Sequence, residues 1–325
     1  MPELEPRIIQ DLVWGETEIS ERVLLEFLDS KTLDRTEGIS QLGLPQEYHY
    51  RTTFSRKSHN IGALLAVRKL TGTVEEQLAS GLHDTTHSAF SHIIDWVLGS
   101  YGKDDHQDNI HKEFLANTEI PDILGRHGLD FNRIVDYKNF PLLEQPAPRL
   151  CADRVDYALR EMMVSDFDPS IVPFCVDSLT VSQNRMVFSN PEAASNFGWG
   201  FMRLLREDWG GKETLARFLV LSNILKDSLI SGLIGMNDFY VDDQHVLDLV
   251  RRDGGIKLRL EDLKKPLDQI PELGVFRGQV IEYKFRYVDP EFLDGTKLTK
   301  LSDYEPQYLD AINLERERSK QGVVI

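Results

Sequence analysis

The sequence has 325 residues, of which 41% are hydrophobic and 28% are charged, the ordinary balance of a globular protein with a substantial core. A formal net charge of -16 disfavours broad electrostatic attachment to nucleic acid or to an anionic membrane, although a locally basic pocket for a small anion is compatible with it. Two cysteines are too few for a disulfide framework, and no signal-like start or long apolar run is present, so we expect a cytoplasmic protein without a membrane span.

Helical periodicity dominates the first half of the chain. Apolar residues recur at helical spacing over residues 23–28 and again over 61–70, directly after His59. Residues 74–97 predict one or two further helices, which carry a histidine-rich segment at 83–92. Two more predicted helices follow, over 106–115 and 150–163.

The pattern changes after residue 169. Residues 179–188 place apolar residues on both sides of a polar turn, which predicts a β-hairpin. The other predicted elements are helices over 191–233, 244–252 and 304–319, and strands at 274–276 and 282–288. We therefore predict a mainly α protein, with a metal-binding catalytic core in residues 1–165. A mostly helical extension in 166–325, with the hairpin and a small mixed α/β C-terminal lobe, would pack on that core.

Histidine and aspartate residues in the first half predict a metal site. Six of the nine histidines lie between His59 and His111, and imidazole nitrogens and carboxylate oxygens are ligands for divalent cations. Neighbouring helical positions are about 100° apart, so His83 and Asp84 would share an ion only near the edge between them, and other helices must supply ligands. His59 and Asp153, each near the start of a predicted helix, complete a set of two imidazoles and two carboxylates.

Three ordered motifs resemble those of a known family. They are Arg56-Lys57-Ser58-His59, the segment from His83-Asp84 through His87 to Phe90-Ser91-His92, and Asp153-Arg154-Val155-Asp156-Tyr157. The order resembles the HD superfamily of metal-dependent phosphohydrolases, and most of all its deoxynucleoside triphosphate triphosphohydrolase branch. The resemblance extends from about residue 11 to residue 163. It implies a helical HD-domain core in which His59, His83, Asp84 and Asp153 hold one ion.

The resemblance also implies roles for further residues. The implied phosphate and sugar contacts are Arg56, Arg154, Tyr157, Arg160, Gln41 and Leu42. The alternative for Arg56, Tyr157 and Arg160 is ion pairing with Asp156 or nearby acids at helical spacing. The implied proton-handling group is His87, Asp95 and His106, with His111 as the alternative to His106. His92 is expected either to support a ligand through a hydrogen bond or to be structural.

These expectations define a reaction class. A divalent ion, whether Mn, Fe, Mg, Ni or Zn, would activate water and neutralise phosphoryl charge while the arginines bind phosphate oxygens. The favoured substrate is a nucleotide, above all a deoxynucleoside triphosphate. The alternatives are a nucleoside monophosphatase or other phosphoester hydrolase, and a non-catalytic metal- or nucleotide-binding sensor. The resemblance alone suggests a homo-oligomer.

Overall fold

The computed structural model describes residues 5–100 and 105–325 and is mainly helical, with 56% helix and 10% strand. The α-helices are α1 (Arg22–Leu28), α2 (Lys31–Asp34), α3 (Arg56–Lys69), α4 (Val74–Leu82), α5 (Ile93–Val97), α6 (His106–Ala116), α7 (Ile120–Arg126), α8 (Phe131–Ile134), α9 (Ala152–Val164), α10 (Ile171–Ser178), α11 (Pro191–Leu204), α12 (Lys212–Ile230), α13 (Asp243–Val250), α14 (Gly254–Asp262), α15 (Leu301–Tyr304) and α16 (Pro306–Gln321). Shorter helical turns are η1 (Arg35–Gly38), η2 (Tyr137–Asn139), η3 (Leu205–Trp209, a π-helical turn), η4 (Met236–Tyr240), η5 (Leu267–Gln269) and η6 (Pro271–Gly274). The predicted mainly α fold is confirmed.

The strands form three small antiparallel or mixed sheets. They are β1 (Arg7–Asp11), β2 (Gly15–Ile19), β3 (Leu179–Ser182), β4 (Arg185–Phe188), β5 (Val280–Ile281), β6 (Glu291–Asp294), β7 (Lys297–Lys300) and β8 (Val323–Val324). The predicted hairpin at 179–188 is confirmed as β3 and β4, and it joins the β6–β7 hairpin through a parallel pairing of Phe188 with Phe292. The β1–β2 hairpin at the N-terminal end was not predicted.

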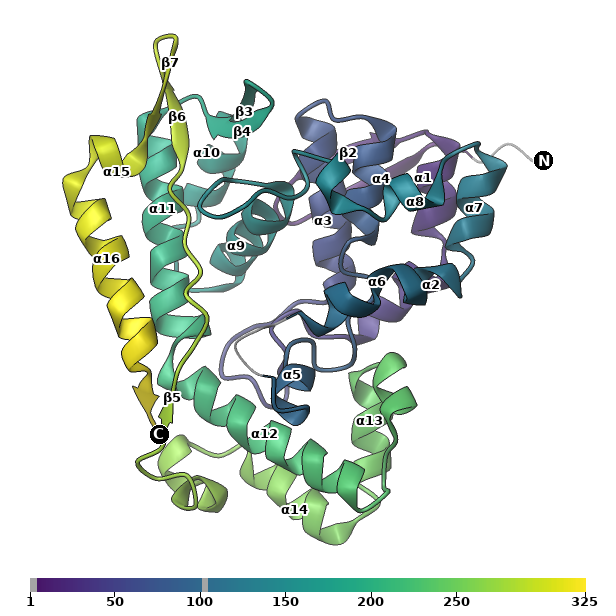
Figure 1. The fold of residues 1–325 in the computed structure, drawn as a ribbon, viewed down its shortest axis with the longest axis vertical. Coiled ribbons are helices and arrows are strands. Elements are labelled where there is room, and N and C mark those ends of the chain that lie inside the picture. Colours follow the sequence, from purple (N-terminus) through teal and green to yellow (C-terminus); the bar gives the residue numbers. More distant parts are fainter. Residues whose placement is uncertain (1–4, 101–104) are drawn as a thin grey trace.

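Helices α3, α4 and α9 pack together at the centre of the molecule (Figure 1). Ser55 caps the N-terminus of α3, because its hydroxyl accepts a hydrogen bond from the Ser58 N–H. The main hydrophobic cluster extends from Val13 to Phe292, so it includes residues on both sides of the predicted boundary at residue 165. That boundary stays a prediction. No helix in the described ranges 5–100 and 105–325 combines the length and apolar character needed to span a membrane.

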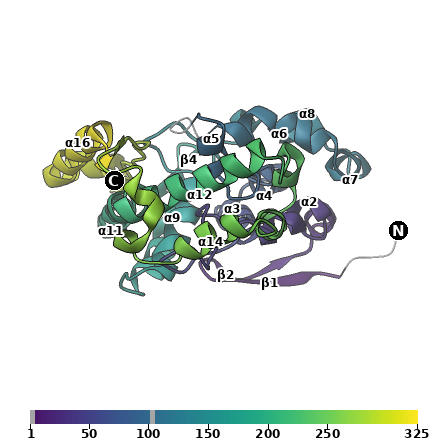
Figure 2. The same ribbon diagram turned by 90° about the horizontal axis from the view of Figure 1, so that it is seen from below.

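A second hydrophobic cluster includes buried residues of α12 and α14, which occupy the lower part of the molecule in Figure 1. Seen from below, α12 crosses the molecule next to α5 (Figure 2), and the two helices are in contact. A third, smaller cluster joins α11 to α16. Because these clusters surround the central helices on several sides, the later part of the chain forms walls around any site on α3, α4 and α9.

The histidine-rich segment is not helical, contrary to our expectation for part of residues 74–97. After α4 ends, residues 83–92 form turns, and Phe90 and Ser91 adopt positive φ angles of 60° and 50°. Backbone N–H groups that would donate within a helix donate here to residues that are distant in the sequence. The Ala89 N–H donates to the Phe239 carbonyl at 2.7 Å, and the Phe90 N–H donates to Asp243 Oδ1 at 2.6 Å. Tertiary hydrogen bonds therefore replace the helical ones here.

The predicted strand at 282–288 is also wrong. Residues 282–290 are extended but have no regular secondary structure, and they link β5 to β6. We call residues 282–290 the strap. In Figure 1 it forms the long connection that runs beside α11 between the labels of β5 and β6. The predicted strand at 274–276 is likewise replaced by the end of η6 and a turn.

Candidate metal centre

Three helices bring the four predicted ligands together. His59 lies in the first turn of α3, His83 follows the last residue of α4, Asp84 is the next residue, and Asp153 lies in the first turn of α9. One ligand atom from each of the four lies within 4.8 Å of the others. Because α3 packs against both α4 and α9, residues separated by up to 94 positions in the sequence meet at one point.

The distances between these atoms fit a single divalent ion. His59 Nε2 is 3.2 Å from His83 Nε2 and 3.3 Å from Asp153 Oδ1, and His83 Nε2 is 3.4 Å from Asp153 Oδ1. Asp84 contributes oxygens at 3.6 Å from His59 Nε2 and 3.7 Å from His83 Nε2. An ion with bonds of about 2.1 Å separates neighbouring ligand atoms by roughly 3.0–3.4 Å. The cluster is therefore of the right size for an ion at its centre.

The orientation of the two imidazoles decides between a metal site and a network of buried polar groups. His59 Nδ1 lies 2.8 Å from Asp156 Oδ2, and His83 Nδ1 lies 2.6 Å from the Ser80 carbonyl oxygen, which only accepts hydrogen bonds. If each Nδ1 carries the proton, both Nε2 lone pairs point at the same space between the carboxylates. Such acceptor partners on the outer nitrogens are typical of metal-ligating histidines.

Charges within the cluster shift the pKa values of its members. Burial opposes protonation of His83, but the charges of Asp84 and Asp153 outweigh it and raise its pKa to about 9. Burial also opposes ionisation of Asp84, yet the charges of His83 and Arg56 hold the pKa of that carboxyl well below its usual range. Two ionised carboxylates thus face a position that favours positive charge.

Asp156 contacts His59 on the side of its ring away from the cluster. It is fully buried, accepts a hydrogen bond from Trp14 Nε1 at 2.6 Å, and forms an ion pair with Arg160 at 2.9 Å. Arg160 is also paired with Asp11 at 3.0 Å, so the β1–β2 hairpin is connected to the predicted ligand His59 through Arg160 and Asp156. Arg160, predicted to bind phosphate, is instead seen in the alternative arrangement, paired with Asp156.

Gly62 lies on α3 where that helix meets the Asp156–Arg160 pair. A Cβ atom at Gly62 would collide with Asp156 Oδ1 and Arg160 Nη2. We expect Gly62→Ala to lower the free energy of unfolding by about 1–3 kcal/mol, because overpacking displaces a buried ion pair. Chemical denaturation checks this. Gly125→Ala is the matched control, since a Cβ there meets nothing within 4 Å, and equal losses in both variants would contradict the prediction.

Three of the four predicted ligands, His83, Asp84 and Asp153, line a cavity of about 710 Å³, which we call the metal cavity. Of the predicted site residues, those that line it are His83, Asp84, Asp153, His87, Arg56, Arg154, Tyr157 and Gln41. Arg56 is fully buried, forms an ion pair with Asp84, and donates to Ser91 Oγ at 2.8 Å. Arg154 is paired with Glu144 at 2.8 Å. Both arginines reach the cavity while already bound to carboxylates.

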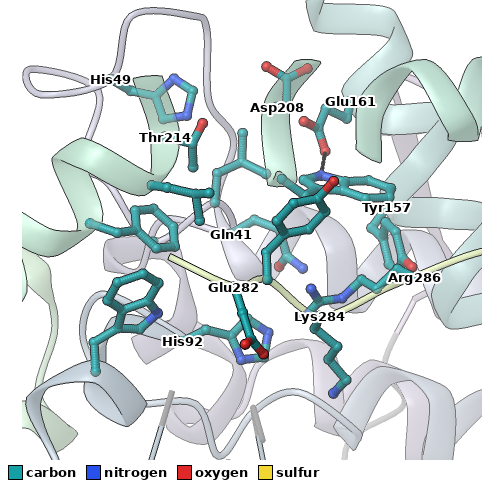
Figure 3. A pocket seen from close by; sticks show the side chains of 17 residues that line it. Gln41, His49, His92, Tyr157, Glu161, Asp208, Thr214, Glu282, Lys284 and Arg286 are labelled. Atoms are coloured by element: carbon teal, nitrogen blue, oxygen red, sulfur yellow. Dashed lines mark hydrogen bonds between the residues drawn. The ribbon is translucent and has the colours of Figure 1, made fainter. Parts of the chain in front are cut away.

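A smaller pocket of about 140 Å³ adjoins the metal cavity (Figure 3), and we call it the aromatic pocket. Its apolar lining residues are Leu42, Trp96, Tyr157, Trp209, Leu215, Phe218 and Tyr283. It shares Gln41, His92, Tyr157, Lys284 and Arg286 with the metal cavity. At its far end Glu161 accepts a hydrogen bond from Trp209 Nε1 at 2.8 Å. Burial and the charge of Asp208 raise the Glu161 pKa to about 8, which favours a neutral carboxyl there.

The three predicted proton-handling residues do not all reach the metal cavity. His87 lines it, with Nε2 3.4 Å from Asp84 Oδ1, and burial together with the charge of Arg56 lowers its pKa to about 4. Asp95 is buried on α5 and accepts a hydrogen bond from Ser100 Oγ at 3.3 Å. His106 Nε2 lies 3.0 Å from the Tyr240 hydroxyl, and neither Asp95 nor His106 is among the described lining residues.

His111, the predicted alternative to His106, does line the metal cavity. Its Nδ1 lies 3.3 Å from Thr86 Oγ1, and its ring packs on Tyr137 at a centroid distance of 4.6 Å. Burial and the charge of His83 lower the pKa of His111 to about 3. The structure thus brings His87 and His111 to the cavity as neutral imidazoles. His92 lies on the shared edge of the two pockets, with its ring 4.9 Å from that of His87.

Several lining residues escaped the sequence analysis. Tyr137 donates its hydroxyl hydrogen to the His83 carbonyl at 2.6 Å, and Asp108 lies on the α6 wall of the metal cavity. Lys284 and Arg286 come from the strap, more than 120 residues after the last motif. The only available signal for them was the alternation of charged and aromatic residues over 282–287, which was interpreted as a strand.

A second group of potential ligands consists of Glu144, Cys151 and Asp153. Arg154 already occupies it, because its guanidinium contacts Glu144 at 2.8 Å and Cys151 Sγ at 3.3 Å. Burial and the charge of Glu144 raise the pKa of the Cys151 thiol above its usual range, which disfavours the thiolate that a metal would need. The four-residue cluster is therefore the better metal site.

Comparison with known proteins places the chain in a family. No family model matches it. The uncharacterized protein YdhJ of Bacillus subtilis is 32% identical over 326 residues, covering 98% of this chain and 98% of YdhJ. The chain belongs to the YdhJ family. The metal-dependent phosphohydrolase cns2 of Cordyceps militaris is 39% identical over 155 residues, which are 47% of this chain and 44% of cns2.

A solved structure extends the comparison. The phosphohydrolase from Bacteroides thetaiotaomicron superposes with a TM-score of 0.63 at 16% sequence identity, covering 93% of this chain and 95% of that one. At this identity the likeness concerns the fold. The similarity to cns2 supports an HD-type metal-dependent phosphohydrolase, which agrees with the predicted hydrolase class for this YdhJ-family chain. The similarity to cns2 also implies a metal, and the four-residue cluster is suited to bind one.

Proposed function

We propose that the protein hydrolyses a phosphoester or phosphoanhydride bond of a nucleotide, with a deoxynucleoside triphosphate as the favoured substrate and triphosphate as the released product. The observation that carries this proposal is the pair of His59 and His83 Nε2 atoms, which lie 3.2 Å apart and face Asp84 and Asp153. Of these four residues, His83, Asp84 and Asp153 line a large cavity. A divalent ion held by these four residues would supply water activated near neutral pH and would neutralise phosphoryl charge.

The protein's own residues position that chemistry. Asp156 and the Ser80 carbonyl hold the imidazoles of His59 and His83 so that their Nε2 atoms face inward. Arg56 lies beside Asp84 and orients its carboxylate. His87 and His111, held neutral by burial, can donate an N–H to a phosphoryl or leaving-group oxygen. We propose His87 as the proton-handling residue, with His111 rather than His106 as its partner in the cavity.

The aromatic pocket favours a substrate with a planar ring. Trp96, Phe218 and Tyr157 offer apolar ring surfaces, and the neutral Glu161 carboxyl can both donate and accept a hydrogen bond. A nucleobase has such a flat body and a hydrogen-bonding edge. We propose Gln41 and Leu42 as sugar contacts. Gln41 lines both the aromatic pocket and the metal cavity, and Leu42 lines the aromatic pocket.

Two other functions give different results in the same assay. A nucleoside monophosphatase would use the same ligands and release orthophosphate, whereas a sensor would bind nucleotide without turnover. We also propose a soluble, cytoplasmic protein that assembles as a homo-oligomer, and residues 1–165 as its catalytic core. The small phosphorylated substrate is its main proposed partner.

The test is an assay of the purified protein with Mn²⁺, Fe²⁺, Mg²⁺, Ni²⁺ or Zn²⁺ in turn. Nucleoside mono-, di- and triphosphates, in ribo and deoxy forms, are supplied while orthophosphate and triphosphate are separated chromatographically. We expect metal-dependent release of triphosphate from deoxynucleoside triphosphates. Release of orthophosphate from monophosphates alone would favour the monophosphatase. Binding without turnover for every metal would contradict the catalytic proposal.

A further inference from the structure

The strap is fixed at both ends. At its start, β5 pairs with β8 near the C-terminus. Near its end, Tyr308 of α16 donates its hydroxyl hydrogen to the Val288 carbonyl at 2.7 Å, and the Asp289 N–H donates to the Pro148 carbonyl at 2.9 Å. An extended segment held at two points keeps its side chains in a defined alternation.

That alternation separates aromatic from basic side chains. The rings of Phe285 and Tyr287 stack at a centroid distance of 4.9 Å, and the Arg316 guanidinium of α16 lies over both. Tyr283, Phe285 and Tyr287 all pack against the hydrophobic cluster between α11 and α16. The two residues between these aromatic anchors are Lys284 and Arg286.

Lys284 and Arg286 line both the metal cavity and the aromatic pocket. In Figure 3 they lie next to each other at the edge of the aromatic pocket, with Arg286 on the side of Tyr157. Arg286 is half-buried, and its charge opposes the rise that burial causes in the Tyr157 pKa. The charge of Lys284 likewise opposes the rise that burial causes in the pKa of Asp108. Arg286 is thus close to Tyr157 of α9, and Lys284 is close to Asp108 of α6.

The metal cavity is also lined by Arg56 and Arg154, which form ion pairs with Asp84 and Glu144. Lys112, Lys138 and Lys284 are exposed, where solvent screens their charge. Arg286 combines partial burial with a position at the junction of the two pockets. A forked guanidinium suits the oxygens of a phosphate group.

We propose that Arg286, assisted by Lys284, binds the phosphate of the substrate where the metal cavity meets the aromatic pocket. The inference rests on the proposed function, and it assigns part of the binding site to the C-terminal region. The strap would hold the phosphate end of the substrate against the ligands while the ring lies in the aromatic pocket.

The experiment measures binding as well as turnover. Isothermal titration calorimetry follows orthophosphate and tripolyphosphate binding to protein loaded with one equivalent of Mn²⁺, for the wild type, Arg286→Met, Arg286→Lys and Lys284→Met. Arg277→Met is the matched control, because Arg277 is not among the described residues that line either pocket. We expect Arg286→Met to weaken tripolyphosphate binding by about tenfold or more and Lys284→Met by less. Arg286→Lys should recover part of the loss.

Other readouts exclude a purely structural role for the strap. Arg286→Met should keep its bound Mn²⁺ and its unfolding midpoint, and any measured KM should rise more than kcat falls. If the wild type turns over no nucleotide, tripolyphosphate binding still tests the inference separately. Unchanged tripolyphosphate affinity in Arg286→Met, or wild-type protein that binds no tripolyphosphate, would overturn it.

Discussion

Replacing Asp84 with asparagine or alanine is expected to remove the bound ion and to lower turnover by more than about a hundredfold. Asp84 oxygens lie 3.6–3.7 Å from the Nε2 atoms of both ligand histidines, so its loss opens the ligand set. Changing an outer partner of a ligand already costs about 10–100-fold in metal affinity or activity, and a direct ligand should cost more. Metal content after dialysis, measured by mass spectrometry, and the phosphohydrolase assay check the prediction.

The two substitutions at Asp84 separate binding from stability. Arg56 is fully buried and paired with Asp84, so Asp84→Ala leaves a buried charge without that partner, while Asp84→Asn keeps an acceptor for it. Asp108→Asn is the control for metal content, since it removes a carboxyl from the same cavity but outside the ligand set. A full equivalent of ion in folded Asp84→Asn would contradict the assigned ligands.

Replacing Asp156 with alanine should have the largest effect on stability. Asp156 and Arg160 are both buried, and without Asp156 the guanidinium keeps only Asp11 among its present carboxylate partners. Breaking such a pair costs about 3–5 kcal/mol of unfolding free energy. The same change frees His59 Nδ1 from its carboxylate, so metal affinity should fall by about 10–100-fold. Denaturant titration and competitive metal titration measure the two effects.

Trp14→Phe provides the matched control for Asp156→Ala. It removes one hydrogen bond to Asp156 Oδ1 but leaves the carboxylate with His59 and Arg160. We expect it to lower stability by about 1–2 kcal/mol and to keep metal affinity near that of the wild type. Wild-type metal affinity in Asp156→Ala would show that the imidazole needs no carboxylate to stay oriented.

The four-residue cluster could be predicted from the sequence because histidine and aspartate are the residue types that bind divalent ions. Histidine and aspartate at His59, His83, Asp84 and Asp153 are recognisable whatever local structure carries them. The local prediction around His83 was less successful. A helix over the histidine-rich segment would need backbone hydrogen bonds that Phe239 and Asp243 supply instead, 150 and 153 positions from their partners Ala89 and Phe90.

The surroundings of the ligands depended on contacts that periodicity does not encode. The resemblance implied that Arg160 of α9 contacts phosphate, yet its guanidinium forms ion pairs with Asp156 and Asp11. The β1–β2 hairpin that carries Asp11 was not predicted at all. Similarly, Arg286 reaches the cavity only because β5 and β6 fix the strap across it.

The central claim is that His59, His83, Asp84 and Asp153 hold one divalent ion. Crystals of the protein grown with Mn²⁺ and measured at the manganese absorption edge test it most directly, because anomalous scattering locates the ion. We predict one peak per chain, about 2.0–2.3 Å from the His59 and His83 Nε2 atoms and the two carboxylates. A peak at Glu144 and Cys151 instead, or no peak at the four residues, would contradict the account.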